Sequence, residues 1–148
     1  MTNLLALTLH IFLLGAMVTF IVVTTPTVFI TLDQQSSQKF LRSIFPRLFK
    51  YCLVLVLTAG ILFIIGKSFY GSIISIISAC GFLVNTYIVT PRINKLRDLS
   101  IENDIIAKKS FKLMHLVSVL VFLFQILGSI SILILYSLNH ILFFFKNI

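Results

Sequence analysis

The sequence predicts an all-α integral membrane protein, a four-helix bundle that forms a single transmembrane domain over residues 1–148. The first observation is composition: 59% of the residues are hydrophobic and 11% are charged, whereas about a quarter of a soluble domain is charged. The second is distribution, because four long stretches contain no Asp, Glu, Lys or Arg: 1–32, 51–66, 68–91 and 113–145. These observations exclude a soluble enzyme, a disordered chain and a nucleic-acid-binding domain.

Each uncharged stretch is long enough to cross a bilayer as a helix. About 20 apolar residues suffice, because the hydrocarbon core is about 30 Å thick and a helix rises 1.5 Å per residue. The stretches do not alternate in polarity as barrel strands do, and a helix satisfies its own backbone polar groups in lipid. The first stretch has no basic n-region and no cleavage site of a signal peptide. We therefore expect four spans, at about 4–30, 46–66, 69–90 and 113–138.

The basic residues gather in two connections. Residues 33–50 and 92–112 hold ten of the twelve Lys and Arg residues, and the first and third connections of a four-helix path lie on one side of the membrane. Since basic loops remain in the cytoplasm, we expect both connections to be cytoplasmic and both termini to be outside, in a bacterial inner membrane. The net charge of +8 then indicates attraction to anionic lipid headgroups, not to nucleic acid. A homo-oligomer or a larger membrane complex stays open.

Both basic connections carry helical patterns. Apolar and basic residues alternate at helical spacing over 35–45, which predicts an amphipathic helix at the membrane surface before the chain turns inward near Pro46. In the other connection, Ser100 followed by acidic residues resembles a helix start. We therefore expect the fourth helix to begin near residue 101 and to enter the bilayer around Leu113.

Polar and small side chains form stripes on the predicted spans, and polar side chains inside a bilayer usually face the bundle interior. One face of the third span carries Gly71, Ser75, Ser78, Phe82 and Asn85. One face of the fourth span carries His115, Ser118, Phe122, Gln125 and Ser129. In the first span, His10, Met17 and Thr24 lie opposite a face that carries Thr8, Gly15, Thr19 and Pro26. Helix packing explains such stripes, and a ligand site is the alternative.

The candidate ligand site is a polar cluster at the cytoplasmic membrane boundary. Its candidate ligand-binding residues are His115, Asn85, Gln125, Ser118, Arg92 and Arg47. They would supply a titratable donor or acceptor, amide contacts and an anion-attracting charge. The structural residues around them are Pro26, Phe45, Pro46, Pro91 and Phe111, and His10 is a second-rank candidate. The sequence shows no catalytic arrangement and no metal-ligand spacing, and it predicts no cofactor.

These motifs resemble the transmembrane protein 205 family of small four-helix membrane proteins. The matching pieces, in chain order, are His10, Pro26 with Phe29, Phe45-Pro46 with Phe49, Asn85 before Pro91-Arg92, and Phe111 with His115 and Ser118. The chain departs from the family at Leu116 and Phe122, where members often have Gly and Asn, and it has no Trp. The resemblance implies a fold and a membrane location, but no particular reaction.

We expect a non-enzymatic membrane protein that binds or passes a small ligand, or that serves as a membrane scaffold. A haem-associated oxidoreductase is the alternative, because the opening is similar to the four-helix type of protoporphyrinogen oxidase. That family has a Lys in its third helix and an Asn-Glu-x-Pro motif in its last, and residues 68–91 contain no Lys. We also expect His10 and His115 to lie near opposite membrane boundaries, so that they could not ligate one haem iron.

Overall fold

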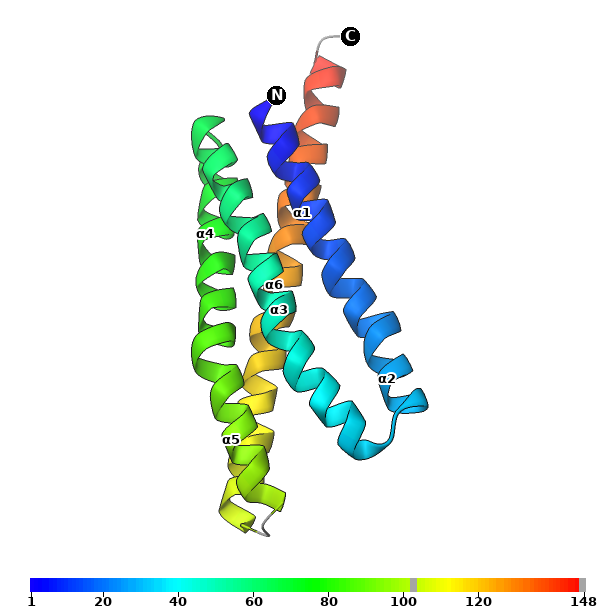
Figure 1. Cartoon of the computed structure of the whole chain (residues 1–148). Coiled ribbons are helices and arrows are strands. Elements are labelled where there is room, and N and C mark those ends of the chain that lie inside the picture. The colour runs from blue at the N-terminus through cyan, green and yellow to red at the C-terminus, as the bar shows by residue number, and fades with distance from the viewer. Residues whose placement is uncertain (102–103, 147–148) are drawn as a thin grey trace.

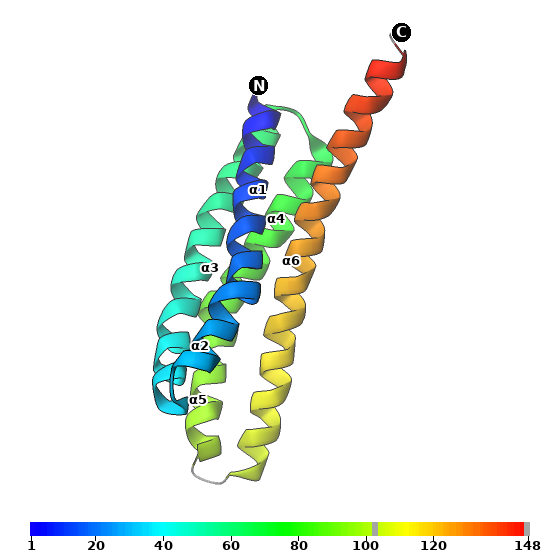
Figure 2. The same ribbon diagram turned by 90° about the vertical axis from the view of Figure 1, so that its right-hand side faces the viewer.

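The structure, a computed structural model, describes residues 1–101 and 104–146, without the side chains of residues 140, 143, 144 and 146. The chain forms four long helices that run up and down around a common core (Figures 1 and 2). No strand occurs in these described ranges. The four helices pack around a ring, because consecutive helices contact one another and the last also contacts the first.

Each helix is long and apolar enough to cross a membrane, which confirms the predicted all-α four-helix membrane bundle. The four candidate spans are Thr2–Thr31, Gln34–Ile65, Phe69–Ile101 and Ile105–Asn139. Both chain ends lie at one end of the bundle, and the first and third connections lie at the other (Figure 1). We call this other end the basic end, because residues 33–50 and 92–112 place most of the Lys and Arg residues there.

The first and third helices are each built from three segments, whereas the second and fourth are continuous. The first comprises α1 (Thr2–Thr19), the π-helical turn η1 (Phe20–Thr24) and α2 (Thr25–Thr31). The third comprises α4 (Phe69–Val84), the π-helical turn η2 (Asn85–Val89) and α5 (Thr90–Ile101). The continuous helices are α3 (Gln34–Ile65) and α6 (Ile105–Lys146). The C-terminal part of α6 projects beyond the other helices (Figure 2).

Each π-helical turn lies directly before a Thr-Pro pair, at residues 25–26 and 90–91. A proline inside an α-helix lacks the N–H donor, and its ring collides with the carbonyl four residues earlier. The wider π turn relieves this collision by shifting the bonding to the carbonyl five residues earlier. The hydroxyl of Thr25 donates to the carbonyl of Phe20 at 2.9 Å, and that of Thr90 donates to Asn85 at 2.7 Å. Each threonine therefore closes the turn that the next proline requires.

The segment 35–45 is helical, as predicted, but it is not a separate helix. It is the first part of α3, which continues through Pro46 to Ile65. Its apolar side chains find partners inside the protein: Leu41 packs in one cluster with Phe20 and Val28. Leu41 is therefore buried against the first helix, and α3 continues through Pro46 without a break.

The fourth helix begins at Ile105 rather than near residue 101. The carboxylate of Asp104 accepts hydrogen bonds from the backbone N–H groups of Ile106 (2.9 Å) and Ala107 (3.0 Å), which caps α6. Ser100 instead lies in the last turn of α5 and donates to the carbonyl of Arg97 at 2.7 Å. An aspartate that accepts two free N–H groups is a strong helix start, and Glu102 lies outside the described residues.

Candidate functional site

His10 is fully buried and joins three helices. Its Nδ1 lies 3.0 Å from the Oγ of Ser129 on α6, and its Nε2 lies 3.0 Å from the Oγ of Ser75 on α4. The hydroxyl of Ser75 donates to the carbonyl of Gly71 at 2.8 Å, which uses its single hydrogen. The Ser75 oxygen must therefore accept from Nε2–H, and the Nδ1 of the neutral ring accepts from the Ser129 hydroxyl.

Small residues let the helices close tightly around His10. A Cβ at Gly71 would lie 2.7 Å from the ring of Phe63, and a Cβ at Gly60 would lie 3.2 Å from the Cβ of Ser75. The Phe63 ring in turn packs against the imidazole, with their centroids 5.8 Å apart. The buried histidine is thus enclosed by packed side chains, as expected for a group that fixes the positions of helices.

Two buried amides lie farther towards the basic end. Gln125 donates to the carbonyl of Ser78 at 3.0 Å, and Asn85 donates to the carbonyl of Ser118 at 3.4 Å. Among the described residues, neither amide oxygen has a hydrogen-bond partner. Both side chains are at most 1% exposed, so each oxygen is an acceptor that water could satisfy if space allows.

Aromatic rings separate these two amides. Phe82 lies between Ser78 and Asn85 along α4, and Phe122 lies between Ser118 and Gln125 along α6. The ring of Phe49 on α3 packs against both of these rings. Its centroid lies 6.3 Å from that of Phe82 and 5.9 Å from that of Phe122. The interior polar groups therefore occupy separate levels of the bundle instead of one continuous polar path.

The structure places the predicted ligand residues in different surroundings. Asn85 and Gln125 are buried and Ser118 is half-buried, whereas His115, Arg92 and Arg47 are exposed. His115 stacks on Phe111, with centroids 6.1 Å apart and rings 9° from parallel. The bundle has one surface groove between α1–η1 and α3 and another between α4 and α6, and neither is lined by His115, Asn85, Gln125, Ser118 or Arg92. A shared pocket for these residues stays a prediction.

The two histidines lie at different levels, as the sequence predicts. His10 bonds to Ser129, and Ser129 is fourteen residues from His115 along α6, or about 21 Å at 1.5 Å per residue. Within the described part of the chain, no group of three His, Cys, Asp or Glu side chains could hold a metal ion.

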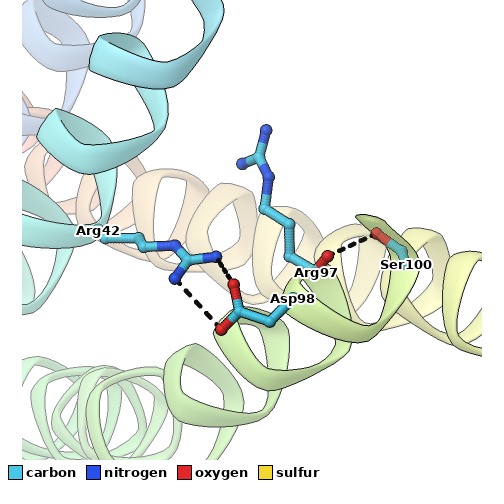
Figure 3. A network of polar contacts seen from close by, with 4 residues as sticks. All are labelled: Arg42, Arg97, Asp98 and Ser100. Carbon is cyan, nitrogen blue, oxygen red and sulfur yellow. Dashed lines mark hydrogen bonds and ion pairs between the residues drawn. The ribbon is translucent and has the colours of Figure 1, made fainter. Parts of the chain in front are cut away.

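An ion pair and a cation–π contact join three helices at the basic end, and Figure 3 draws the ion pair. Both Nη atoms of Arg42 on α3 donate to the carboxylate of Asp98 on α5, which forms an ion pair. The neighbouring Arg97 extends in another direction (Figure 3), and its Cζ lies 5.5 Å from the centroid of the Phe111 ring on α6. The ion pair and the cation–π contact therefore join α3, α5 and α6 beyond the uncharged spans.

A groove of about 660 Å³ opens on the outer surface between α1–η1 and α3. Most of its wall is apolar, including Phe12, Ala16 and Leu48. Gly15 lines the groove, and a Cβ added there would meet no atom within 4 Å. A second groove, of about 260 Å³, lies between α4 and α6. The larger groove is lined partly by the face of the first span that the sequence shows as small and polar.

Polar groups of the larger groove lie towards its basic end. They include Thr19, Thr24 and Arg47. Tyr51, the other lining residue with a polar side-chain group, lies one turn of α3 farther from that end than Arg47. Thr8 and Thr58, at other exposed positions, donate to the carbonyl one turn earlier, whereas no hydrogen bond of the described residues involves the hydroxyl of either groove threonine. Arg47 donates to Ser43 at 2.7 Å, and it forms no ion pair with a described carboxylate.

Comparison with known protein families assigns the chain to a family. Residues 8–101 match the family described as "Domain of unknown function (DUF4149)". No curated protein and no solved structure matches the chain. The matched region contains His10, Ser75, Asn85 and the whole lining of the larger groove, and it ends before α6. Because the match covers more than half of the sequence, the chain belongs to the DUF4149 family.

Proposed function

We propose that this protein binds a small amphiphilic ligand from the bilayer, without transforming it, in the groove between α1–η1 and α3. The observation that supports this function best is the groove itself, of about 660 Å³, which opens outward on a membrane span. An apolar wall with a few polar groups at one end is the usual composition of a ligand site. Binding is favoured over passage, because Phe49, Phe82 and Phe122 divide the polar interior.

Gly15 supports the proposal independently. A glycine in the interior of a helix costs about 1 kcal/mol relative to alanine, and glycines at helix contacts usually compensate by allowing close approach. No such approach occurs at Gly15, because its missing side chain would point into open space. At Gly60 and Gly71, by contrast, a neighbouring helix occupies that space. The absent side chain at Gly15 keeps the groove open.

Native mass spectrometry of the purified protein tests the proposal. The wild type is expected to retain one lipid-sized mass through purification in mild detergent. Gly15→Leu would fill the groove and abolish that retention, whereas Thr58→Leu, at an exposed position outside the groove, would leave it unchanged. Equal retention by the wild type and Gly15→Leu would contradict the proposal, provided that both variants show the same thermal unfolding.

The orientation and the location form part of the proposal. We infer that the basic end faces the cytoplasm of a bacterium and that both termini lie outside the inner membrane. The gathering of the basic residues at one end of the bundle supports this orientation. The ligand would then enter the groove from the cytoplasmic leaflet, because the polar groups of the groove lie towards the basic end.

The resemblance to the transmembrane protein 205 family also stays a proposal. Two of its motif prolines, Pro26 and Pro91, each follow a π-helical turn and a threonine in the same arrangement. We expect this arrangement to be shared if the two families are related. An experimental structure of a transmembrane protein 205 relative with straight α-helices at both positions would contradict the relationship.

A further inference from the structure

We infer that the ligand of the α1–α3 groove is an anionic glycerophospholipid, with its phosphate at Arg47 and one acyl chain along Gly15. This inference rests on the function proposed above and names its ligand class. Three features carry it: the length of the groove, the unpaired hydroxyls within it, and the charge at its basic end.

The length of the groove fits one lipid chain. Its lining runs along the first helix from Ile11 to Thr24, a rise of about 20 Å at 1.5 Å per residue. One leaflet contributes about half of the hydrocarbon core, or about 15 Å. A single acyl chain and its glycerol backbone therefore extend over the groove from the basic end towards the middle of the bilayer.

The hydroxyls of Thr19 and Thr24 provide donors at the level of the glycerol backbone. A hydroxyl in an apolar environment is costly without a hydrogen-bond partner, and threonines in helices usually bond to a carbonyl of the preceding turn. Thr8 and Thr58 follow that rule. Thr19 and Thr24 line the groove instead, where the ester carbonyls of a glycerolipid would accept from them.

Arg47 provides the headgroup site. Its guanidinium is exposed, lines the groove and has no carboxylate partner among the described residues. A guanidinium matches the geometry of a phosphate and forms charge-assisted hydrogen bonds with it. The surrounding segment 33–50 has four basic residues and one acidic residue, so a lipid with net negative charge is favoured over a zwitterionic lipid.

A competition experiment tests the ligand class. The purified protein is incubated with equal amounts of phosphatidylglycerol and phosphatidylcholine with identical acyl chains, and retained lipid is measured by native mass spectrometry. We expect the wild type to prefer phosphatidylglycerol by about fivefold to tenfold, as a charge-assisted contact would give. Arg47→Gln would reduce the preference to near unity. Lys50→Gln, an exposed basic neighbour outside the groove, would retain it.

The outcomes separate the two proposals. If Gly15→Leu abolishes retention while the wild type binds both lipids equally, the anionic headgroup is overturned and the ligand-binding function stands. If Lys50→Gln loses the preference as fully as Arg47→Gln, general surface attraction explains it and the site at Arg47 is overturned. If inorganic phosphate displaces the lipid, the acyl chain contributes little and the lipid assignment fails. If Gly15→Leu retains lipid like the wild type, both proposals fail.

Discussion

The Nε2 of His10 lies 3.0 Å from the Oγ of Ser75, and that hydroxyl donates its only hydrogen to the carbonyl of Gly71 at 2.8 Å. Because this hydroxyl has no second hydrogen, the direction of each hydrogen bond that links Ser129, His10, Ser75 and Gly71 is fixed. Ser129 donates to His10, His10 donates to Ser75, and Ser75 donates to Gly71. One neutral imidazole thereby joins α6, α1 and α4 in the interior of a membrane bundle.

The tautomer is a first testable prediction. We expect the ¹⁵N NMR spectrum of histidine-labelled protein to show the proton of His10 on Nε2, with Nδ1 unprotonated. Ser129→Ala should remove the donor to Nδ1 and lower the free energy of unfolding by about 1 kcal/mol, the usual size for buried polar contacts in membrane proteins. Ser131→Ala, whose hydroxyl lies nearer the surface beside Tyr70, should have a smaller effect. An Nδ1–H tautomer would contradict the assigned directions.

A pair of glycines gives the second prediction. Gly71→Ala would place a Cβ 2.7 Å from the Phe63 ring, and overpacking of this kind costs about 1–3 kcal/mol. Gly15→Ala meets no atom within 4 Å and should be neutral or stabilising by up to about 1 kcal/mol. Unfolding in SDS titrations measures both. Equal destabilisation by the two substitutions would show that Gly15 is also a packing contact.

The cap of α3 predicts a dependence on pH. Hydrogen bonds from the Ser36 side chain, and from the backbone N–H groups of Ser36 and Gln35, lower the pKa of Asp33 below its ordinary value of 3.8. Because the folded-state pKa is the lower one, the cap stabilises the folded state above the ordinary pKa, and its contribution is lost as pH falls through the folded pKa. NMR titration of the Asp33 carboxyl should give a midpoint below 3.8, and a midpoint at or above that value would contradict the cap.

The basic end supplies a fourth prediction, at the ion pair drawn in Figure 3. Asp98→Asn should weaken the contact with Arg42 and let α5 separate from the first turns of α3. The separation would appear as a wider distribution of the distances between spin labels on α3 and α5. Lys95→Gln, an exposed residue of α5 without an ion pair in the described structure, is the matched control. Unchanged distances in Asp98→Asn would show that packing alone holds this end.

Orientation can be tested with added cysteines in a Cys80→Ser background, in which the remaining Cys52 is buried. Gln35→Cys and Leu99→Cys lie at the basic end, and both positions are exposed. We expect a membrane-impermeant maleimide to label them only after permeabilisation of cells. Asn139→Cys, near the other end, should be labelled in intact cells. The reverse pattern would overturn the inferred topology.

The sequence predicted the buried face of the third helix. All five stripe residues of the third helix are buried, from Gly71 to Asn85. On the predicted face of the fourth helix, Phe122, Gln125 and Ser129 are buried, whereas Ser118 is half-buried and His115 is exposed. For the first helix the sequence left open which of its two faces is buried. Helical periodicity is sufficient for the prediction on the third helix, because apolar and polar spacing determine the face that a helix buries.

The sequence could not predict which residues meet across the bundle. The sequence ranked His10 as a second-rank candidate, although it is the residue that joins three helices. Its partners Ser75 and Ser129 are 65 and 119 positions away. Such contacts depend on the relative rotation and depth of three helices, which no local spacing encodes. The groove beside Gly15 was missed for a related reason. A glycine at a helix contact and a glycine facing open space have the same sequence pattern.

We propose that an anionic lipid occupies the groove between α1–η1 and α3. Photo-crosslinking in vesicles tests it most directly, with phosphatidylglycerol that carries a diazirine on one acyl chain. Peptide mapping should locate adducts mainly on residues 11–20 and 44–51, and Gly15→Leu should reduce them severalfold. Adducts spread evenly over the exposed faces of α4 and α6, or unchanged in Gly15→Leu, would contradict the claim.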